Sequence, residues 1–131
     1  MPAAPVAPPA NFPGPLTEWL TLQALVRLGK RLGEDFTYQS AIEGGRTEKG
    51  GLVIDFLFTN PPDLAINPQG LHFHYGLGAG KIASDKIARA VLAGLGITLI
   101  FIDEDDLTRD AVFYVKEALA YRDHSRLAKG F

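Results

Sequence analysis

Hydrophobic and polar positions change period along the chain, and these periods predict seven secondary-structure elements. Apolar residues recur at helical spacing over residues 16–32, 84–95 and 108–122. Alternating or continuous apolar runs predict strands at residues 36–42, 52–58 and 97–102, with another strand after the turn Asn60-Pro61-Pro62-Asp63. The order helix, strand, strand, strand, helix, strand, helix predicts an α/β protein, in which a mixed four-stranded sheet is flanked by helices.

The helical patterns also predict which positions face the core. For the second long helix, residues 84–95, the predicted buried stripe is Ile87, Val91 and Leu95. Asp85 falls in the predicted first turn, where the helix dipole favours an acid. The acidic run 103–106 follows the last strand, and we interpret it as a solvated turn with a helix N-cap rather than a metal cage.

Asp55 interrupts the second strand, which is otherwise wholly apolar (LVIDFLF). A carboxylate in such a strand is costly unless it pairs with another group or binds a metal, and both explanations stay open. If the following loop is odd-numbered and centred on Pro61, Asp55 lies opposite Asn67 and one diagonal step from Gln69. Pro68 indicates a bulge or an early end to strand pairing at this point.

Two histidines follow the third strand. His72 and His74 are two residues apart, so they share a face if the segment is extended, although half-buried aromatic packing explains such a pair equally well. The next run, residues 76–81 (GLGAGK), is one residue short of phosphate-loop spacing, and Ile82 stands where Ser or Thr would bind magnesium. The sequence therefore excludes a nucleotide-hydrolysing loop of that type.

The length, net charge and composition of the chain exclude several classes of protein. The chain has 131 residues, enough for one domain with a single core, and a formal net charge of -2. There is no cysteine, which excludes disulfides and thiolate metal sites, and no apolar run or signal pattern predicts a membrane span or a secreted chain. The mild acidity argues against coating nucleic acid by bulk charge, but it does not argue against a nuclease with metal-binding carboxylates.

We expect three segments. Residues 1–15 are rich in Pro and Ala and carry no charged side chain, so we expect an extended arm, which either is a disordered leader or docks on a partner in a homodimer or larger assembly. Residues 16–122 hold the predicted elements. Residues 123–131 are a mildly basic C-terminal tail.

The order of elements, with Glu18 in the first helix, Asp55 in the second strand and a polar cluster ending the third, resembles the core of the PD-(D/E)XK nuclease superfamily. The resemblance covers about residues 16–107. It is nearest to the very-short-patch-repair-like and phage homing endonucleases, which carry a Glu, Asp, aromatic-His, Asp set. In this chain the matching positions are Glu18, Asp55, Phe73-His74 and Asp85.

The resemblance implies a restriction-endonuclease-like three-layer core, of order αβββαβα, that cleaves DNA with Mg²⁺ or Mn²⁺. It implies that Asp55 and Glu18 bind the metal, that His74 moves a proton, and that Asp85 orients His74 or binds a second ion. Accessory positions would be His72, Asn67, Gln69, Lys81 and Gln39, and the glycine-rich loop 43–51 offers Arg46 and Lys49 to DNA phosphates. Such an enzyme would act in the cytoplasm of a bacterial or phage-infected cell, or be carried in a phage particle.

The chain departs from the commoner superfamily pattern, which has an acid, any residue, then lysine in the third strand. Asn67-Pro68-Gln69 occupies that place with neutral residues. Asparagine is a poorer magnesium ligand than a carboxylate, and glutamine cannot supply lysine's charge. Either the site has moved to the histidine form, or catalysis has lapsed and the fold is a structural or interaction subunit of a phage or other nucleoprotein assembly. A nucleic-acid-binding module without cleavage is a third reading.

Overall fold

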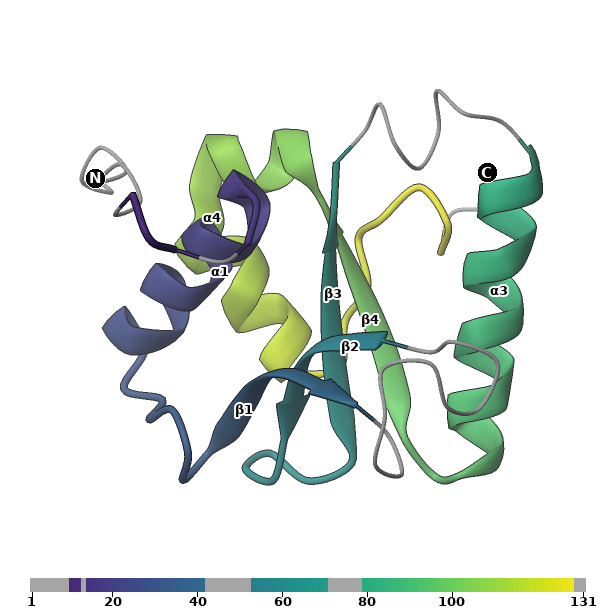
Figure 1. Ribbon diagram of the computed structural model, residues 1–131, viewed down its shortest axis with the longest axis horizontal. Helices are drawn as coiled ribbons and strands as arrows, with labels where there is room; N and C mark the ends of the chain where they lie inside the picture. The colour runs from purple at the N-terminus through teal and green to yellow at the C-terminus, as the bar shows by residue number, and fades with distance from the viewer. Residues whose placement is uncertain (1–9, 13, 42–52, 71–78, 129–131) are drawn as a thin grey trace.

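A mixed four-stranded sheet with helices on both faces forms the centre of the protein (Figure 1). The computed structural model describes residues 10–12, 14–41, 53–70 and 79–128. Its elements are α1 (Leu16–Arg27), β1 (Phe36–Ala41), β2 (Val53–Phe58), β3 (Leu64–Gln69), α3 (Ala79–Gly94), β4 (Thr98–Asp103) and α4 (Glu104–Leu119). The predicted α/β class with a mixed four-stranded sheet is confirmed.

The strands lie in the order β1-β2-β3-β4. The β1–β2 and β2–β3 pairs are antiparallel, and β3 and β4 are parallel. Helix α3 connects β3 to β4, as a parallel pair requires. Because β3 and β4 run the same way, their carboxyl ends meet at one end of the sheet, at the top of Figure 1.

Two hydrophobic clusters fill the two faces of the sheet. Helices α1 and α4 pack together on one face, where β2, β3 and β4 contribute Phe56, Ile66 and Ile100. Helix α3 covers the other face, where Leu92 packs in a cluster with Phe101. None of the helices in the described ranges is long and apolar enough to cross a membrane.

The hairpin between β2 and β3 forms in the predicted register. Phe58 pairs with Leu64, so the loop has an odd number of residues centred on Pro61, and it contains a cis Asn60–Pro61 peptide. Pairing between β2 and β3 ends at Phe56 and Ile66, whereas the β3–β4 ladder continues through Pro68. Proline has no N–H to donate, and the predicted early end of pairing is confirmed on the β2 side.

The first helix is shorter than predicted. It ends at Arg27, with Leu28 as its C-cap and Gly29 in the left-handed region at φ 84°, rather than continuing to residue 32. Pro15 is the N-cap, and Thr17 lies inside the helix, where its carbonyl accepts a hydrogen bond from the Thr21 hydroxyl.

The predicted buried face of the second long helix is wrong. α3 starts at Ala79, inside the glycine-rich run, so Asp85 lies beyond the first turn and the dipole argument does not apply to it. Ile87, Val91 and Leu95 are 64%, 41% and 46% exposed, whereas Asp85 and Leu92 are buried. Both sides of this helix carry apolar residues, and the side with Asp85 and Leu92 is the one that faces the sheet.

Helix α4 begins directly after β4 and contains a kink. Asp110 has non-helical angles (φ -161°, ψ 80°), and its side chain accepts the Phe113 N–H at 3.1 Å, as an N-cap residue does. After α4 the chain returns along β4. The Asp123 carboxylate accepts the Phe101 N–H at 3.2 Å, and Leu127 is buried in the cluster on the α3 face.

Candidate functional site

The point where β2 separates from β3 is held by a side chain. The Asp55 N–H donates a hydrogen bond of 2.9 Å to the Asn67 side-chain oxygen, one step beyond the last β2–β3 pair. The predicted neighbourhood of Asp55 and Asn67 is therefore present. The Asp55 residue is half-buried, between the buried residues Ile54 and Phe56. Asn67 fixes the backbone that carries this carboxylate, so its side-chain oxygen is already engaged.

Gln69 and Asp103 are neighbours at the carboxyl ends of β3 and β4. They are register partners in the parallel ladder, so their side chains project from the same face of the sheet. Gln69 is 0% exposed and Asp103 is 1% exposed. Neither the oxygen nor the nitrogen of the Gln69 amide has a hydrogen-bond partner, which is costly for a buried polar group.

Asp103, Asp105 and Asp106 gather at the start of α4. Each offers a carboxylate oxygen within 4.8 Å of the others. Among the described residues, these three acids form a group that could hold a metal ion. The earlier interpretation as a solvated turn is wrong for Asp103, which is buried and makes no side-chain cap. Because α4 begins at Glu104, directly after β4, the three carboxylates lie close together at the end of that strand.

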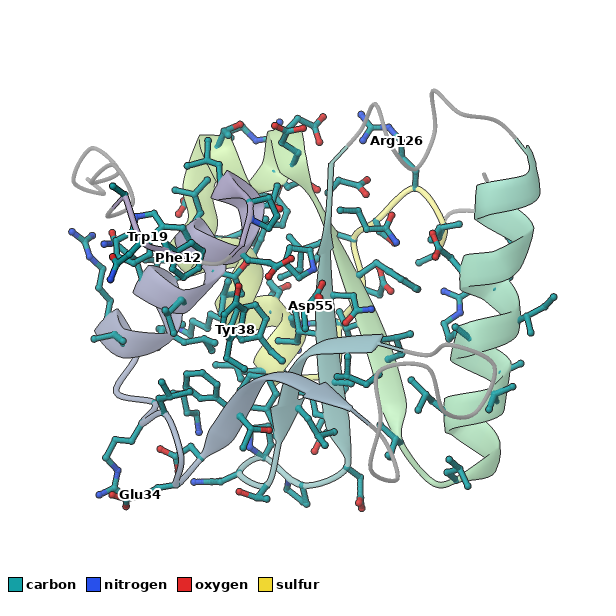
Figure 2. All side chains as sticks on the ribbon, in the orientation of Figure 1. Phe12, Trp19, Glu34, Tyr38, Asp55 and Arg126 are labelled. Atoms are coloured by element: carbon teal, nitrogen blue, oxygen red, sulfur yellow. The ribbon has the colours of Figure 1, made fainter. Side chains whose placement is uncertain are left out.

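Arg126 neutralises two of these carboxylates from 20 or more residues away. Its backbone N–H and Nη1 both donate to Asp103 Oδ2 at 3.0 Å, and Nη1 and Nη2 donate to the two Asp105 oxygens at 3.2 and 2.8 Å. The hydrogen bond from Arg126 is the main reason that the pKa of Asp105 lies below its usual value. Figure 2 shows Arg126 beyond the ends of β3 and β4.

Asp106 has its own arginine. Arg109 pairs with the Asp106 carboxylate and donates to the Tyr114 hydroxyl at 2.7 Å. This hydrogen bond to Tyr114 is the largest cause of the raised pKa of Arg109, and the Asp106 carboxylate raises it further. The three aspartates therefore have cationic partners from two different segments.

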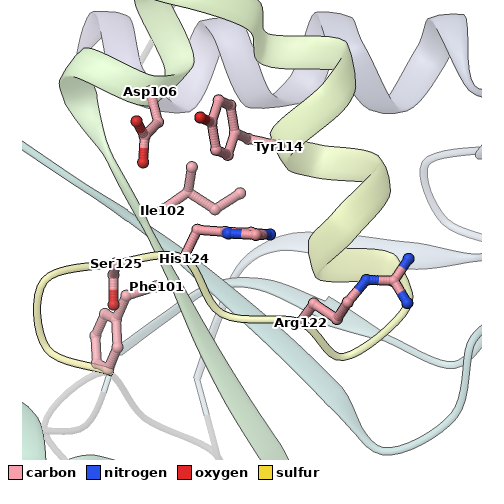
Figure 3. Close-up of a pocket in the computed structure, with 7 residues that line it drawn as sticks. All are labelled: Phe101, Ile102, Asp106, Tyr114, Arg122, His124 and Ser125. Carbon is pink, nitrogen blue, oxygen red and sulfur yellow. The ribbon is translucent and has the colours of Figure 1, made fainter. Parts of the chain in front are cut away.

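A small pocket lies beside this cluster (Figure 3). It is lined by Phe101, Ile102, Asp106, Tyr114, Arg122, His124 and Ser125. Glu117 accepts from Arg122 at 2.8 Å and lies 3.0 Å from His124 Nε2. These contacts, with Arg122 the larger cause, lower the pKa of Glu117 from the usual 4.5 to about 2.

Glu18 lies in a different environment, on α1. Its Oε1 accepts a 2.6 Å hydrogen bond from the Tyr38 hydroxyl, and the residue is 8% exposed. Phe12 stacks on Tyr38 with ring centroids 5.7 Å apart and contacts Trp19 edge-on at 5.0 Å, as Figure 2 shows. Residues of the N-terminal segment thus pack on the same chain over Glu18.

The structure brings together only some of the predicted site residues. Asp55 and Asn67 are joined, but Glu18 and Asp85 stand on helices that cover opposite faces of the sheet. Within the described ranges, Glu18, Asp55 and Asp85 do not form a group of three metal-binding acids. The predicted residues His72, His74, Arg46 and Lys49, and the side chains of Lys81 and Gln39, lie outside what the structure describes.

Sequence reasoning missed Arg126 and the Gln69–Asp103 pair. Arg126 sits in a segment that the pattern predicts as a tail, and nothing nearby in sequence marks it as a partner of Asp103. The Gln69–Asp103 pair follows from the parallel register of β3 and β4, which the sequence does not specify.

Comparison with known proteins gives no relative: no protein-family model, curated protein or solved structure matches the chain.

Proposed function

We propose that the chain is a metal-dependent DNA endonuclease whose centre is built on Asp55. The observation that supports this most is a half-buried carboxylate between the buried residues Ile54 and Phe56, at the position where β2 leaves β3, with its backbone fixed by Asn67. A carboxylate held on a rigid strand is the kind of ligand that a magnesium site needs.

The Asp55 carboxylate is an oxygen ligand of the kind that a hard cation prefers. The carboxylate of Asp55 would hold Mg²⁺ or Mn²⁺, and Asn67 acts by holding the Asp55 backbone in place. When bound, the ion would polarise the scissile phosphate and lower the pKa of a coordinated water. Tyr38 orients the Glu18 carboxylate, and the resemblance assigns proton transfer to His74.

A plasmid-nicking assay tests this proposal. Purified protein should convert supercoiled plasmid to open-circular DNA with Mg²⁺ or Mn²⁺, and neither Asp55→Ala nor His74→Ala should do so. The unfolding temperature of Asp55→Ala should equal or exceed that of the wild type, because a half-buried carboxylate, which is costly to desolvate, is removed from the strand. A large fall would instead identify Asp55 as half of a structural ion pair.

A second candidate, a non-catalytic subunit of a larger assembly, is favoured by one observation. Ile87 and Val91 on α3, with Leu95 directly after its end, are exposed apolar residues at helical spacing. Contiguous exposed apolar residues on a small domain mark interaction surfaces. Light scattering on the intact protein and on an Ile87→Ser, Val91→Ser variant would separate this role from that of a monomeric enzyme.

A further inference from the structure

The acidic group at the start of α4 has the composition of a cation site. Asp103 closes β4, and Asp105 and Asp106 lie in the first turn of α4, with carboxylate oxygens within 4.8 Å of one another. The Asp103 side chain is 2% exposed and that of Asp105 is 40% exposed, so the group reaches from the protein interior to the surface. Three carboxylates at this distance repel one another, and a cation among them relieves that repulsion.

Gln69 supplies an independent reason to expect a ligand here. It is the register partner of Asp103, so its side chain leaves the sheet on the same face and one strand away. It is fully buried, and both atoms of its amide lack a hydrogen-bond partner. An apolar residue of similar size would avoid this desolvation cost, so an amide at this position is best explained by a group that it binds.

We propose that Asp103, Asp105 and Asp106, with the side-chain oxygen of Gln69, bind a divalent cation, and that the Arg126 guanidinium replaces that cation when it is absent. Carboxylate and amide oxygens are the ligands that Mg²⁺, Mn²⁺ and Ca²⁺ prefer. Once Arg126 leaves, the Gln69 NH₂ can donate to the Asp103 carboxylate, which satisfies both ends of the amide.

Arg126 is placed to move. Its side chain is 39% exposed, and it comes from the C-terminal segment rather than from the sheet or a helix. A partly exposed guanidinium regains water when it leaves an ion pair, and a divalent cation in its place keeps the buried Asp103 carboxylate paired. The site does not use Asp55, so cation binding here does not depend on the proposed nuclease activity.

Manganese titration followed by two-dimensional ¹H–¹⁵N NMR locates the ion. In Asp55→Asn, which removes the proposed nuclease ligand, paramagnetic Mn²⁺ should still broaden the amide signals of residues 103–106, Gln69 and Arg126 at the lowest concentrations. Broadening that is spread over surface acids in general, or that disappears with Asp55→Asn, would overturn the proposal.

Two variants separate a cation site from a structural ion-pair cluster. Arg126→Gln should tighten Mn²⁺ binding about tenfold relative to Arg122→Gln, which removes the same charge from a pair with Glu117. Gln69→Leu should weaken binding about tenfold, while raising the unfolding temperature in EDTA. Equal affinities for the two arginine variants, or unchanged affinity in Gln69→Leu, would contradict the proposal.

Removing a carboxylate completes the test. Asp103→Asn should abolish the local broadening, and if that variant does not fold, Asp105→Asn replaces it because Asp105 is partly exposed. Full retention of the local broadening in a folded carboxylate variant would contradict the assignment.

Discussion

The Asn67 side-chain oxygen accepts a hydrogen bond from the Asp55 N–H at 2.9 Å, just where the β2–β3 ladder stops. The bond replaces a backbone pairing that the separation of the strands has removed. It also joins two positions of the proposed site, because a neutral residue of the third strand holds the backbone of the acid in the second strand.

Asn67→Ala should therefore act on stability and on the Asp55 site together. Loss of the acceptor leaves the Asp55 N–H without its partner and should lower the free energy of unfolding by about 1 kcal/mol. Urea denaturation measures this change. Asn67→Asp keeps an acceptor oxygen and should recover most of the lost stability, whereas equal losses in the two variants would show that the hydrogen bond is unimportant.

The packing of the N-terminal segment on Glu18 can be tested with one methyl group. A Cβ at Gly14 would lie 2.1 Å from the Tyr38 hydroxyl and 2.6 Å from Glu18 Oε1, so Gly14→Ala should cost about 1–3 kcal/mol of unfolding free energy. Gly94→Ala is the matched control, because a Cβ there meets nothing within 4 Å, and alanine at this helical position should be neutral or stabilising. Similar melting temperatures for the two variants would argue against the contact.

Glu117 makes stability depend on pH. Its pKa is about 2 in the folded protein, below the usual 4.5, so its contribution is present above the unfolded pKa and is lost as pH falls towards about 2. Glu117→Gln should therefore be less stable than the wild type near pH 6, and the difference should shrink on acidification. Glu34→Gln, which removes an exposed carboxylate paired with Arg31, should show a much smaller pH-dependent difference. A Glu117→Gln difference that stays constant with pH would contradict the assignment.

The orientation of α3 predicts unequal effects on stability for apolar residues on its two sides. Leu92→Ala should lower the free energy of unfolding by about 2–5 kcal/mol, because Leu92 is fully buried against the sheet. Ile87→Ala removes a side chain that is 64% exposed and should change it by no more than about 0.5 kcal/mol. A large loss for Ile87→Ala in a monomeric sample would mean that the helix is rotated.

The sequence was informative where the interactions are local. Alternation and turn chemistry predicted the β2–β3 hairpin, its centre at Pro61 and the end of pairing at Pro68, since each depends on residues close together in the chain. The face of α3 could not be predicted in this way. Ile87, Val91 and Leu95 form as good an apolar stripe as the side that is buried, and only packing against the sheet decides between them.

The site was less predictable than the fold because its contacts join distant segments. The neighbourhood of Asp55 and Asn67 followed from the hairpin register. The pairs Glu18–Tyr38 and Asp103–Arg126 are separated by about 20 residues of chain, and no periodicity encodes which charged or hydroxyl group will meet which acid. Among the described residues, the acids that lie close together are three aspartates at the start of α4 (Asp103, Asp105 and Asp106). The predicted acids Glu18, Asp55 and Asp85 do not form such a group.

The rate of DNA cleavage by Asp55→Asn tests the central claim most directly. Under single-turnover conditions with Mg²⁺ or Mn²⁺, this variant should lose cleavage by about 10³-fold or more, because the change removes the charge of the proposed metal ligand with little change in shape. Asp63→Asn is the control: Asp63 is exposed at φ 56° in the hairpin loop, where asparagine is well tolerated, and its rate should equal that of the wild type. Equal cleavage rates for the wild type and Asp55→Asn would contradict an endonuclease centred on Asp55. So would the absence of cleavage by the wild type, Asp55→Asn and Asp63→Asn alike.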